Sequence, residues 1–329
     1  MREAILYKKM GGKKVSCFLC ARRCLVGEGK RGFCGVRENR GGKLYSLVWG
    51  RPCSYAIDAI EKKPFFHFFP GTSAFSLATV GCNFRCLHCQ NWEISQTREI
   101  YGESVSPERI VELASGCGGI AYTYTEPTIF MEYALDIAKL ARAKDMYNVF
   151  VTNGYMTPEA VGEMKLIDAS RIDLKSMRDK FYKEICNASL EPVLESIKLL
   201  HKRGHIELIN LIIPGKNDSE EELHELSRWV RDLDRDIPLH FTAYHPANKL
   251  DSQPTPAKTI ERAREIAMEE GVRFVYAGNL PGHPGENTYC YNCKELLIRR
   301  SGFDVISNKV KKEARCPKCG SGIKIVNSI

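Results

Sequence analysis

The chain has 329 residues, of which 43% are apolar, and this is enough for one large α/β domain with appendages or for two to three smaller units. The composition excludes a disordered chain. No apolar run approaches the roughly 18 residues that a membrane span needs, and no apolar signal segment follows the first residues, so we expect a cytoplasmic protein. The net charge of +8 is spread along the chain and favours a solvated basic surface over a nucleic-acid-binding face.

The fourteen cysteines are the most informative part of the composition. Cytosolic redox buffers keep thiols reduced, so cysteines in a chain without a secretory signal indicate metal sites more than disulfides. Eleven of them form three groups, near the two ends and before the middle of the chain. Cys53, Cys117 and Cys186 stand alone, and we expect them to be small buried apolar residues.

The first group has the spacing C-x2-C-x3-C-x9-C, and its members are Cys17, Cys20, Cys24 and Cys34. Four thiolates can hold zinc or an iron–sulfur cluster, and the neighbouring Arg and Lys residues would offset their negative charge. We expect structural zinc here, with a second cluster that relays electrons as the alternative. The group and the lead-in after it form an N-terminal cysteine-rich region over residues 1–70.

The lead-in ends in IEKKPFFHFFPG, directly before the first strand of the central region. We expect its four phenylalanines to pack against the central domain. The sequence leaves open whether Lys62 or Lys63 lies beside an active site.

Residues 71–280 alternate between strand and helix patterns. Apolar, β-rich runs cover residues 74–80, 119–123, 148–152, 171–175, 206–213, 238–244 and 273–277. Helical patterns separate them: Ser106 caps one helix, with Pro107 at its first position, and Asp218 or Ser219 caps another. Six or seven βα units predict an α/β fold with a parallel sheet closed wholly or partly into a barrel.

The second cysteine group lies in VGCNFRCLHCQNWEIS, directly after the first of these strands. Cys82, Cys86 and Cys89, called the trio below, are therefore on a βα loop at the C-terminal end of the barrel, where barrel enzymes carry their chemistry. Three thiolates can hold three irons of a cubane 4Fe-4S cluster and leave the fourth iron open to a substrate or cofactor. The alternative is a zinc site made by the trio and His88.

The last group consists of two C-x2-C pairs separated by 22 residues, and its members are Cys290, Cys293, Cys316 and Cys319. This spacing is typical of zinc ribbons. A closed four-thiolate site would fold a C-terminal module over residues 281–329, which is too short for an apolar core of its own. A rubredoxin-like iron centre is the alternative, because the same ligands hold either metal.

The trio after the first strand of a partial barrel resembles the radical S-adenosylmethionine (radical SAM) superfamily, in the form found in pyruvate formate-lyase activating enzymes. VTNG, DLKS, LIIPGKND and AYHP, at the third to sixth strands, resemble further motifs of that group. The resemblance implies a partial (β/α)6 TIM-like barrel and a 4Fe-4S cluster whose open iron binds SAM. It also implies an electron donor such as ferredoxin or flavodoxin, and cleavage of SAM to a 5′-deoxyadenosyl radical that abstracts hydrogen from a substrate.

The same resemblance assigns SAM contacts to residues at the ends of the strands. Glu126 would receive the SAM ammonium group, and Lys175 would supply a cation for the SAM carboxylate. Three further side chains would hydrogen-bond the ribose or methionine groups: Thr152, Asn153 and Asp173.

The resemblance adds one more candidate site residue, and the sequence differs from the family motifs at two places. His245, in AYHP, would pack on the cofactor or reach the substrate. Tyr124 and Thr125 replace two glycines of the superfamily motif next to Glu126. Val151 replaces an Asp that helps the activating enzymes to bind a monovalent cation, so we do not expect such a cation site.

A longer likeness runs from DAIEKKPFFHFFPGTSAFSLATVGCNFRCLHCQNWEISQ through YTYTEPT to the cysteine-rich ends. It resembles the radical SAM member of the AmmeMemoRadiSam system and implies Memo-like and AMMECR-like proteins as partners. It does not imply a particular product.

Two functional classes follow. The leading one is a radical SAM enzyme that abstracts hydrogen from a small molecule or a protein side chain, with a glycyl-radical activase acting on a partner enzyme as its variant. The other is a non-catalytic metal-binding module that binds RNA. The sequence disfavours the second class, because it has no RNA-stacking motif.

Overall fold

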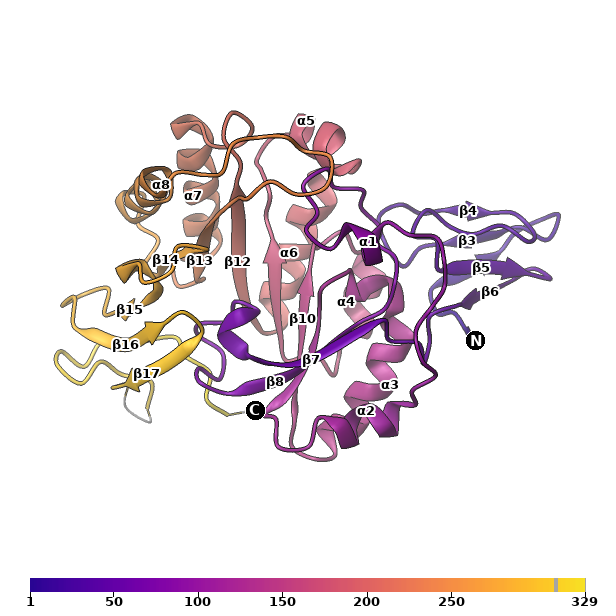
Figure 1. The fold of residues 1–329 in the computed structure, drawn as a ribbon, viewed down its shortest axis with the longest axis horizontal. Helices are drawn as coiled ribbons and strands as arrows, with labels where there is room; N and C mark the ends of the chain where they lie inside the picture. The colour runs from indigo at the N-terminus through magenta and orange to yellow at the C-terminus, as the bar shows by residue number, and fades with distance from the viewer. Residues whose placement is uncertain (311–312, 329) are drawn as a thin grey trace.

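The computed structural model describes residues 1–310 and 313–328, and an eight-stranded sheet forms the centre of the molecule (Figure 1). Seven strands are parallel and follow one another across the sheet in chain order: β8 (Ser73–Ala78), β9 (Gly119–Tyr122), β10 (Tyr147–Thr152), β11 (Ala169–Asp173), β12 (His205–Ile212), β13 (Leu239–Ala243) and β14 (Val275–Gly278). Each coincides with a predicted strand. The α/β fold with a partly closed parallel barrel is therefore confirmed.

The eighth strand, β7 (Ser54–Ala59), was not expected from the sequence. It pairs antiparallel with β8 and forms one edge of the sheet, while β14 forms the other. Tyr55 and Ile57 of β7 are exposed. The strand therefore lacks the continuous apolar run that marks a strand buried on both faces.

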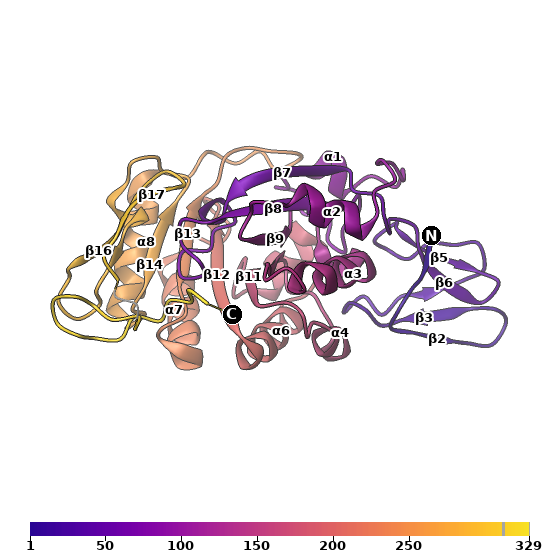
Figure 2. The same cartoon turned by 90° about the horizontal axis from the view of Figure 1, so that it is seen from below.

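Helices connect the parallel strands and cover the outside of the sheet (Figure 2). They are α2 (Pro107–Leu113), α3 (Met131–Arg142), α4 (Pro158–Glu163), α6 (Glu191–Arg203), α7 (Glu220–Asp234) and α8 (Ala257–Glu269), with the short α1 (Trp92–Ser95) and α5 (Asp179–Phe181) in loops. The predicted caps are present: the Ser106 hydroxyl accepts a bond from the N–H of Arg109, and Ser219 accepts one from the N–H of Glu222.

Small antiparallel sheets lie at the two ends of the molecule (Figures 1 and 2). The N-terminal strands are β1 (Arg2–Glu3), β2 (Tyr7–Lys9), β3 (Val15–Cys17), β4 (Leu25–Val26), β5 (Arg37–Arg40) and β6 (Lys43–Ser46). The C-terminal ones are β15 (Thr288–Tyr289), β16 (Leu296–Ser301) and β17 (Asp304–Asn308). The two cysteine-rich appendages are thus separate structures on opposite sides of the barrel.

The end of the chain returns to the lead-in before β8. Val326 forms a parallel bridge with Phe68, its N–H donates to the carbonyl of His67, and its carbonyl accepts from Phe69. The lead-in also packs against the sheet as expected, since Phe65 and Phe68 lie in one buried cluster with residues of β8 to β11. Lead-in, barrel and C-terminal module therefore share a packed interface.

Among the helices of residues 1–310 and 313–328, none has both the length and the apolar character needed to cross a membrane.

Candidate active site

A cavity of about 390 Å³ lies at the C-terminal ends of the parallel strands. Residues from the lead-in, the loop after β8, the strand ends and the C-terminal module line it. The predicted site residues in this lining are Cys82, Cys86, Cys89, Glu126, Thr152, Asn153, Asp173 and Lys175. The fold therefore gathers residues from four strand ends at the edge where barrel enzymes carry their chemistry.

The trio lies on the loop between β8 and α1. The Cys82 sulfur accepts a bond from the N–H of Phe84 at 3.3 Å, and the Cys89 sulfur lies 3.2 Å from the Ser95 hydroxyl. Burial raises the pKa values of the Cys82 and Cys89 thiols. Because thiolates are the metal-binding form, metal binding at this loop would release protons.

Cys186 was expected to be an isolated buried cysteine, and it is fully buried. It lies beside Cys86 because the backbone carbonyls of residues 185 and 186 accept bonds from the N–H groups of Leu87 and Arg85. A hydrogen bond with Cys186, followed by burial, raises the pKa of the Cys86 thiol well above its usual range. The structure thus adds a fourth cysteine next to the trio, which the sequence spacing did not reveal.

Glu126 follows β9 and is almost fully buried. Its Oε1 accepts bonds from the N–H and hydroxyl of Thr128 and from the hydroxyl of Thr152, at 3.0, 2.5 and 2.7 Å. Its Oε2 accepts one bond, from the N–H of Asn153 at 2.9 Å. Burial raises the pKa of this carboxyl group. A carboxylate oxygen can accept two bonds, so Oε2 retains capacity for one more donor.

The cationic side of the cavity is at the end of β11. The Lys175 ammonium group donates to Asp173 at 2.8 Å, and Arg171 pairs with the other oxygen of the same carboxylate. Asn153 connects this side of the cavity to the trio loop, because its amide donates to Asn83 at 2.7 Å and lies 3.8 Å from the Cys82 sulfur. The cavity is therefore lined by the Glu126 carboxyl group at the end of β9 and by the charge cluster of Asp173, Lys175 and Arg171 at the end of β11.

Val151 and His245 differ in their position relative to the cavity. Val151 lines the cavity and is buried, so an apolar side chain stands where the activating enzymes have Asp. His245 is exposed and is not part of the cavity lining, and its proposed contact with the cofactor or substrate stays a prediction.

His88, the alternative zinc ligand, is buried in the cavity wall. Within residues 1–310 and 313–328 its Nδ1 has no hydrogen-bond partner, and burial together with Lys175 lowers the pKa of the imidazole to about 3. In the same residues, the ligand atoms of His88 and the trio do not form a group within 4.8 Å of one another. The structure therefore does not place these four residues as a mononuclear zinc site.

Lys62 and Lys63 both line the cavity, and Lys63 is the buried one of the two lead-in lysines. Its ammonium group donates to Asp58 of β7 at 2.5 Å and lies 4.4 Å from the centre of the Tyr124 ring. Burial lowers the pKa of Lys63 to about 8, although Asp58 opposes this shift. Tyr124, which replaces a superfamily glycine, completes the group by donating its hydroxyl to Asp58 at 2.6 Å.

The far wall of the cavity comes from the C-terminal module. Glu286, Gly302 and Phe303 line it, together with Glu61 of the lead-in and His240 of β13. Sequence reasoning treated the module as a separate folded unit and missed this contribution, because its distance along the chain gives no signal of contact.

The four C-terminal cysteines form a compact group in which all four sulfur atoms lie within 4.8 Å of one another. Cys290 and Cys319 are 3.6 Å apart, as are Cys293 and Cys316. A tetrahedral ion with metal–sulfur bonds of about 2.3 Å requires sulfur atoms about 3.8 Å apart. This geometry suits a single zinc or iron ion.

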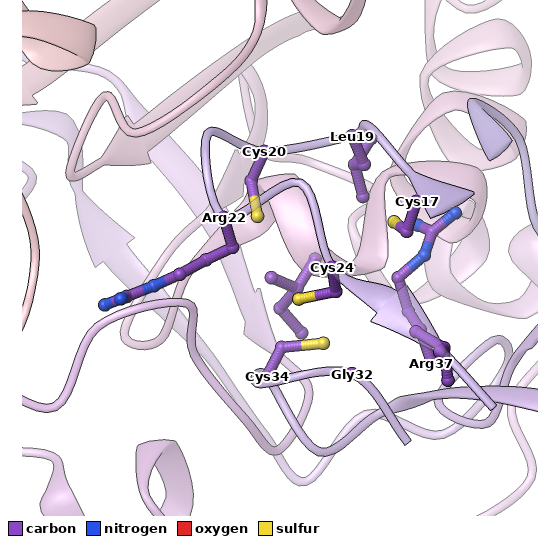
Figure 3. Close-up of a pocket in the computed structure, with 10 residues that line it drawn as sticks. Cys17, Leu19, Cys20, Arg22, Cys24, Gly32, Cys34 and Arg37 are labelled. Carbon is purple, nitrogen blue, oxygen red and sulfur yellow. The ribbon is translucent and has the colours of Figure 1, made fainter. Parts of the chain in front are cut away.

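The four N-terminal cysteines line a second, enclosed pocket beside β3 and β5 (Figure 3). Leu19, Val26 and Ile129 form its apolar wall, and Arg22 and Arg37 supply positive charge. Cys17, Cys20 and Cys34 are buried, and Cys24 is half-buried. All four predicted ligands are therefore brought together.

Comparison with known proteins gives three similarities. A family profile described as the radical SAM superfamily matches residues 76–230. An uncharacterized protein of Methanocaldococcus jannaschii is 51% identical over 334 residues, which cover 99% of this chain and 100% of that protein. Pyruvate formate-lyase 1-activating enzyme of Escherichia coli K12 is 25% identical over 219 residues, which cover 60% of this chain and 89% of that enzyme.

Among solved structures, SuiB of Streptococcus suis bound to the precursor peptide SuiA has a TM-score of 0.52 at 14% identity. The aligned region covers 68% of this chain and 52% of SuiB. At this identity the match concerns the barrel fold.

Proposed function

The chain belongs to the radical SAM superfamily and is a radical SAM enzyme, and we propose that the cavity at the C-terminal ends of β8 to β14 is its active site. Membership implies a 4Fe-4S cluster and SAM. The observation that carries the proposal is the convergence of the trio with Glu126 and Lys175 on one cavity.

The residues present fit both groups. We assign the cluster to the three thiols of the trio, which line the cavity, whereas the neighbouring Cys186 is not among the lining residues. We assign SAM to the wall formed by the strand ends. The free acceptor position on Glu126 Oε2 suits the SAM ammonium group, and the Lys175 ammonium group suits its carboxylate. Thr152, Asn153 and Asp173 offer hydrogen bonds to the remaining polar groups.

The trio would hold the cluster, which would supply the electron for reductive cleavage of SAM and thus for hydrogen abstraction from a substrate. The residues of the chain itself position SAM and keep water away from it. Buried Glu126 is fixed by four bonds from its own surroundings, so it presents its charge without reorganising. The substrate side is the far wall, where Glu286 and Phe303 of the C-terminal module line the cavity.

A glycyl-radical activase is the second candidate, and the similarity to pyruvate formate-lyase 1-activating enzyme favours it. It requires a partner protein with a glycine loop as substrate. Both candidates require a one-electron donor such as ferredoxin or flavodoxin and are consistent with a cytoplasmic location.

The narrower kinship to the AmmeMemoRadiSam system is also part of the proposal, with Memo-like and AMMECR-like proteins as partners. What supports it is that residues of its IEKKPFF segment line the cavity: Glu61, Lys62, Lys63, Pro64 and Phe66. The segment that carries the likeness is thus in a position to select the substrate.

The test is anaerobic cleavage of SAM. The protein is reconstituted with iron and sulfide, reduced and given SAM, and 5′-deoxyadenosine is quantified for the wild type and for Cys82/Cys86/Cys89→Ala. We expect product from the wild type and a loss of at least about 1,000-fold in the variant. Cys117→Ala, which changes a cysteine outside the three groups, is the matched control and should keep full activity.

Equal product from the trio variant, or no product together with no effect of SAM on the cluster's electron paramagnetic resonance (EPR) signal in the wild type, would overturn the assignment.

A further inference from the structure

We propose that Cys17, Cys20, Cys24 and Cys34 hold an iron–sulfur cluster of several irons, not a single zinc ion, and that this cluster passes electrons to the trio. Occupancy of the pocket does not depend on the proposed function, whereas the transfer of electrons rests on it.

The three cysteine groups differ in spacing. Within residues 1–310 and 313–328, only the C-terminal four bring three or more sulfur atoms within 4.8 Å of one another. The trio, which belongs to the superfamily's cubane site, does not reach this closeness, and neither do the N-terminal four. A cubane places each thiolate on a different iron, so its ligands stand farther apart than those of one ion. In this respect the N-terminal group is like the trio and unlike the C-terminal four.

The pocket also carries charge that suits a thiolate cage. Arg37 lines it and is 2% exposed. One guanidinium nitrogen, Nη2, contacts Glu132 at 2.9 Å and the carbonyl of Ile5 at 2.6 Å. The other two, Nε and Nη1, are buried and have no partner within the described part of the chain. Buried N–H groups of a cation are costly unless they are bonded, and anionic sulfur at this position would accept them.

A backbone hydrogen bond to one of the N-terminal cysteines also suits anionic sulfur. The N–H of Phe33 donates to the Cys24 sulfur at 3.5 Å, much as the N–H of Phe84 donates to Cys82 in the trio. Hydrogen bonds to cluster sulfurs tune the reduction potential. The two sites thus share one kind of supporting bond.

The pocket lies against the trio loop. A Cβ atom at Gly81, the residue before Cys82, would stand 2.8 Å from the carbonyl oxygen of Cys34. The Arg85 guanidinium spans the junction, because it donates to the carbonyls of Phe33 and Cys82 at 2.8 and 2.7 Å. In the proposed step, one electron from a low-potential ferredoxin- or flavodoxin-type donor reduces the N-terminal cluster, which is reoxidised as the trio cluster is reduced. No bond forms or breaks.

Metal and sulfide analysis tests the occupancy. The chain with Cys82/Cys86/Cys89→Ala is reconstituted anaerobically with iron, sulfide and zinc all present. We expect about four irons and about four acid-labile sulfides per chain at the remaining cubane-type site, and an EPR signal after reduction that SAM does not change. Zinc and rubredoxin-type iron contain no labile sulfide. A folded chain with two zinc ions and no labile sulfide would overturn the proposal.

Two further variants keep the result interpretable. Adding Cys24→Ser to the trio variant changes the most exposed ligand, and it should abolish or alter the signal while the circular dichroism spectrum is kept. Arg37→Lys in the same background keeps the positive charge but removes the fork of N–H groups, so we expect the cluster to remain with a shifted midpoint potential. An unchanged signal in both variants would place the cluster elsewhere.

The transfer of electrons has its own measurement. In the otherwise wild-type chain, Cys24→Ser should slow the reduction of the trio cluster by a protein donor at least tenfold. The rate is measured by stopped-flow spectroscopy. Reduction at the wild-type rate would overturn the relay and leave the SAM cleavage test of the proposed function untouched.

Discussion

The two four-cysteine groups at opposite ends of the molecule differ in almost every property except their ligands. The C-terminal four are compact, with two sulfur pairs at 3.6 Å, and Cys319 is exposed. The N-terminal four are more widely spaced and surround an enclosed pocket with a buried arginine. The number of thiols therefore does not determine the metal centre, since the backbone sets the distances between the sulfurs and thus the kind of group that fits.

Their relations to the active site differ as well. The N-terminal pocket touches the trio loop through Gly81 and Arg85. The C-terminal module instead meets the lead-in through Arg300, which donates to the carbonyl of Phe66 at 2.8 Å and lies 3.6 Å from Glu61. One appendage therefore contacts the trio loop, and the other lines the far wall of the cavity.

The largest expected effect comes from breaking the compact group. Cys316→Ser removes a buried ligand of the four-cysteine site, which stabilises the module together with a small apolar cluster that includes Leu297 and Ile298. We expect the loss of one metal ion per chain and several kcal/mol of the module's stability, out of the roughly 10 to 16 kcal/mol associated with structural zinc. Limited proteolysis should cut within residues 281–329. Cys117→Ala is the control, and a protease-resistant variant would show that metal does not hold the module.

Removing the charge of Arg37 is next in size. Arg37→Leu would leave Glu132 buried without its partner, at a cost of about 3 to 5 kcal/mol. Urea unfolding measures the difference. Arg40→Leu, which changes an arginine paired with Glu38 at the surface of the same strand, should cost under about 1 kcal/mol. Equal effects would argue against a special role for the buried charge.

The junction between the pocket and the trio loop can be tested at one position. Gly81 has φ +95°, and a Cβ atom there would stand 2.6 Å from Val36. Gly81→Ala should therefore cost about 2 kcal/mol through backbone strain and overlap. It should also change the EPR signals of the two proposed clusters, at the trio and at the N-terminal cysteines. Gly11→Ala, where a Cβ atom meets no neighbour within 4 Å, is the control.

The last expected effect is on the pH dependence of stability and concerns Glu61, at the contact between the C-terminal module and the lead-in. Burial raises the pKa of Glu61 from 4.5 to about 7, so between these pH values the folded chain holds a proton that the unfolded chain has released. Stability should therefore fall as pH rises from about 4.5 to about 7. Glu61→Gln should flatten this slope in thermal unfolding curves. A slope equal to that of the wild type would assign it to other groups.

The seven parallel strands could be predicted because strands buried on both faces read as continuous apolar runs. β7 could not, since Tyr55 and Ile57 face solvent at the sheet edge. In the site, the trio and the strand-end residues were predictable from local motifs. Cys186 was not, because its closeness to Cys86 depends on how a distant loop folds back. The partner of Lys63 likewise depends on β7, the missed strand.

The return of the chain to its own lead-in has a consequence for biosynthesis. The ring of His67 contacts the carbonyl of Lys324, a residue 257 positions later. At 5 to 20 residues per second, roughly 13 to 50 s of translation separate the two. The trio loop leaves the ribosome well before Glu286, Gly302 and Phe303, which line the far wall of the cavity. The cavity is therefore assembled in two stages, first the wall at the strand ends and later the far wall.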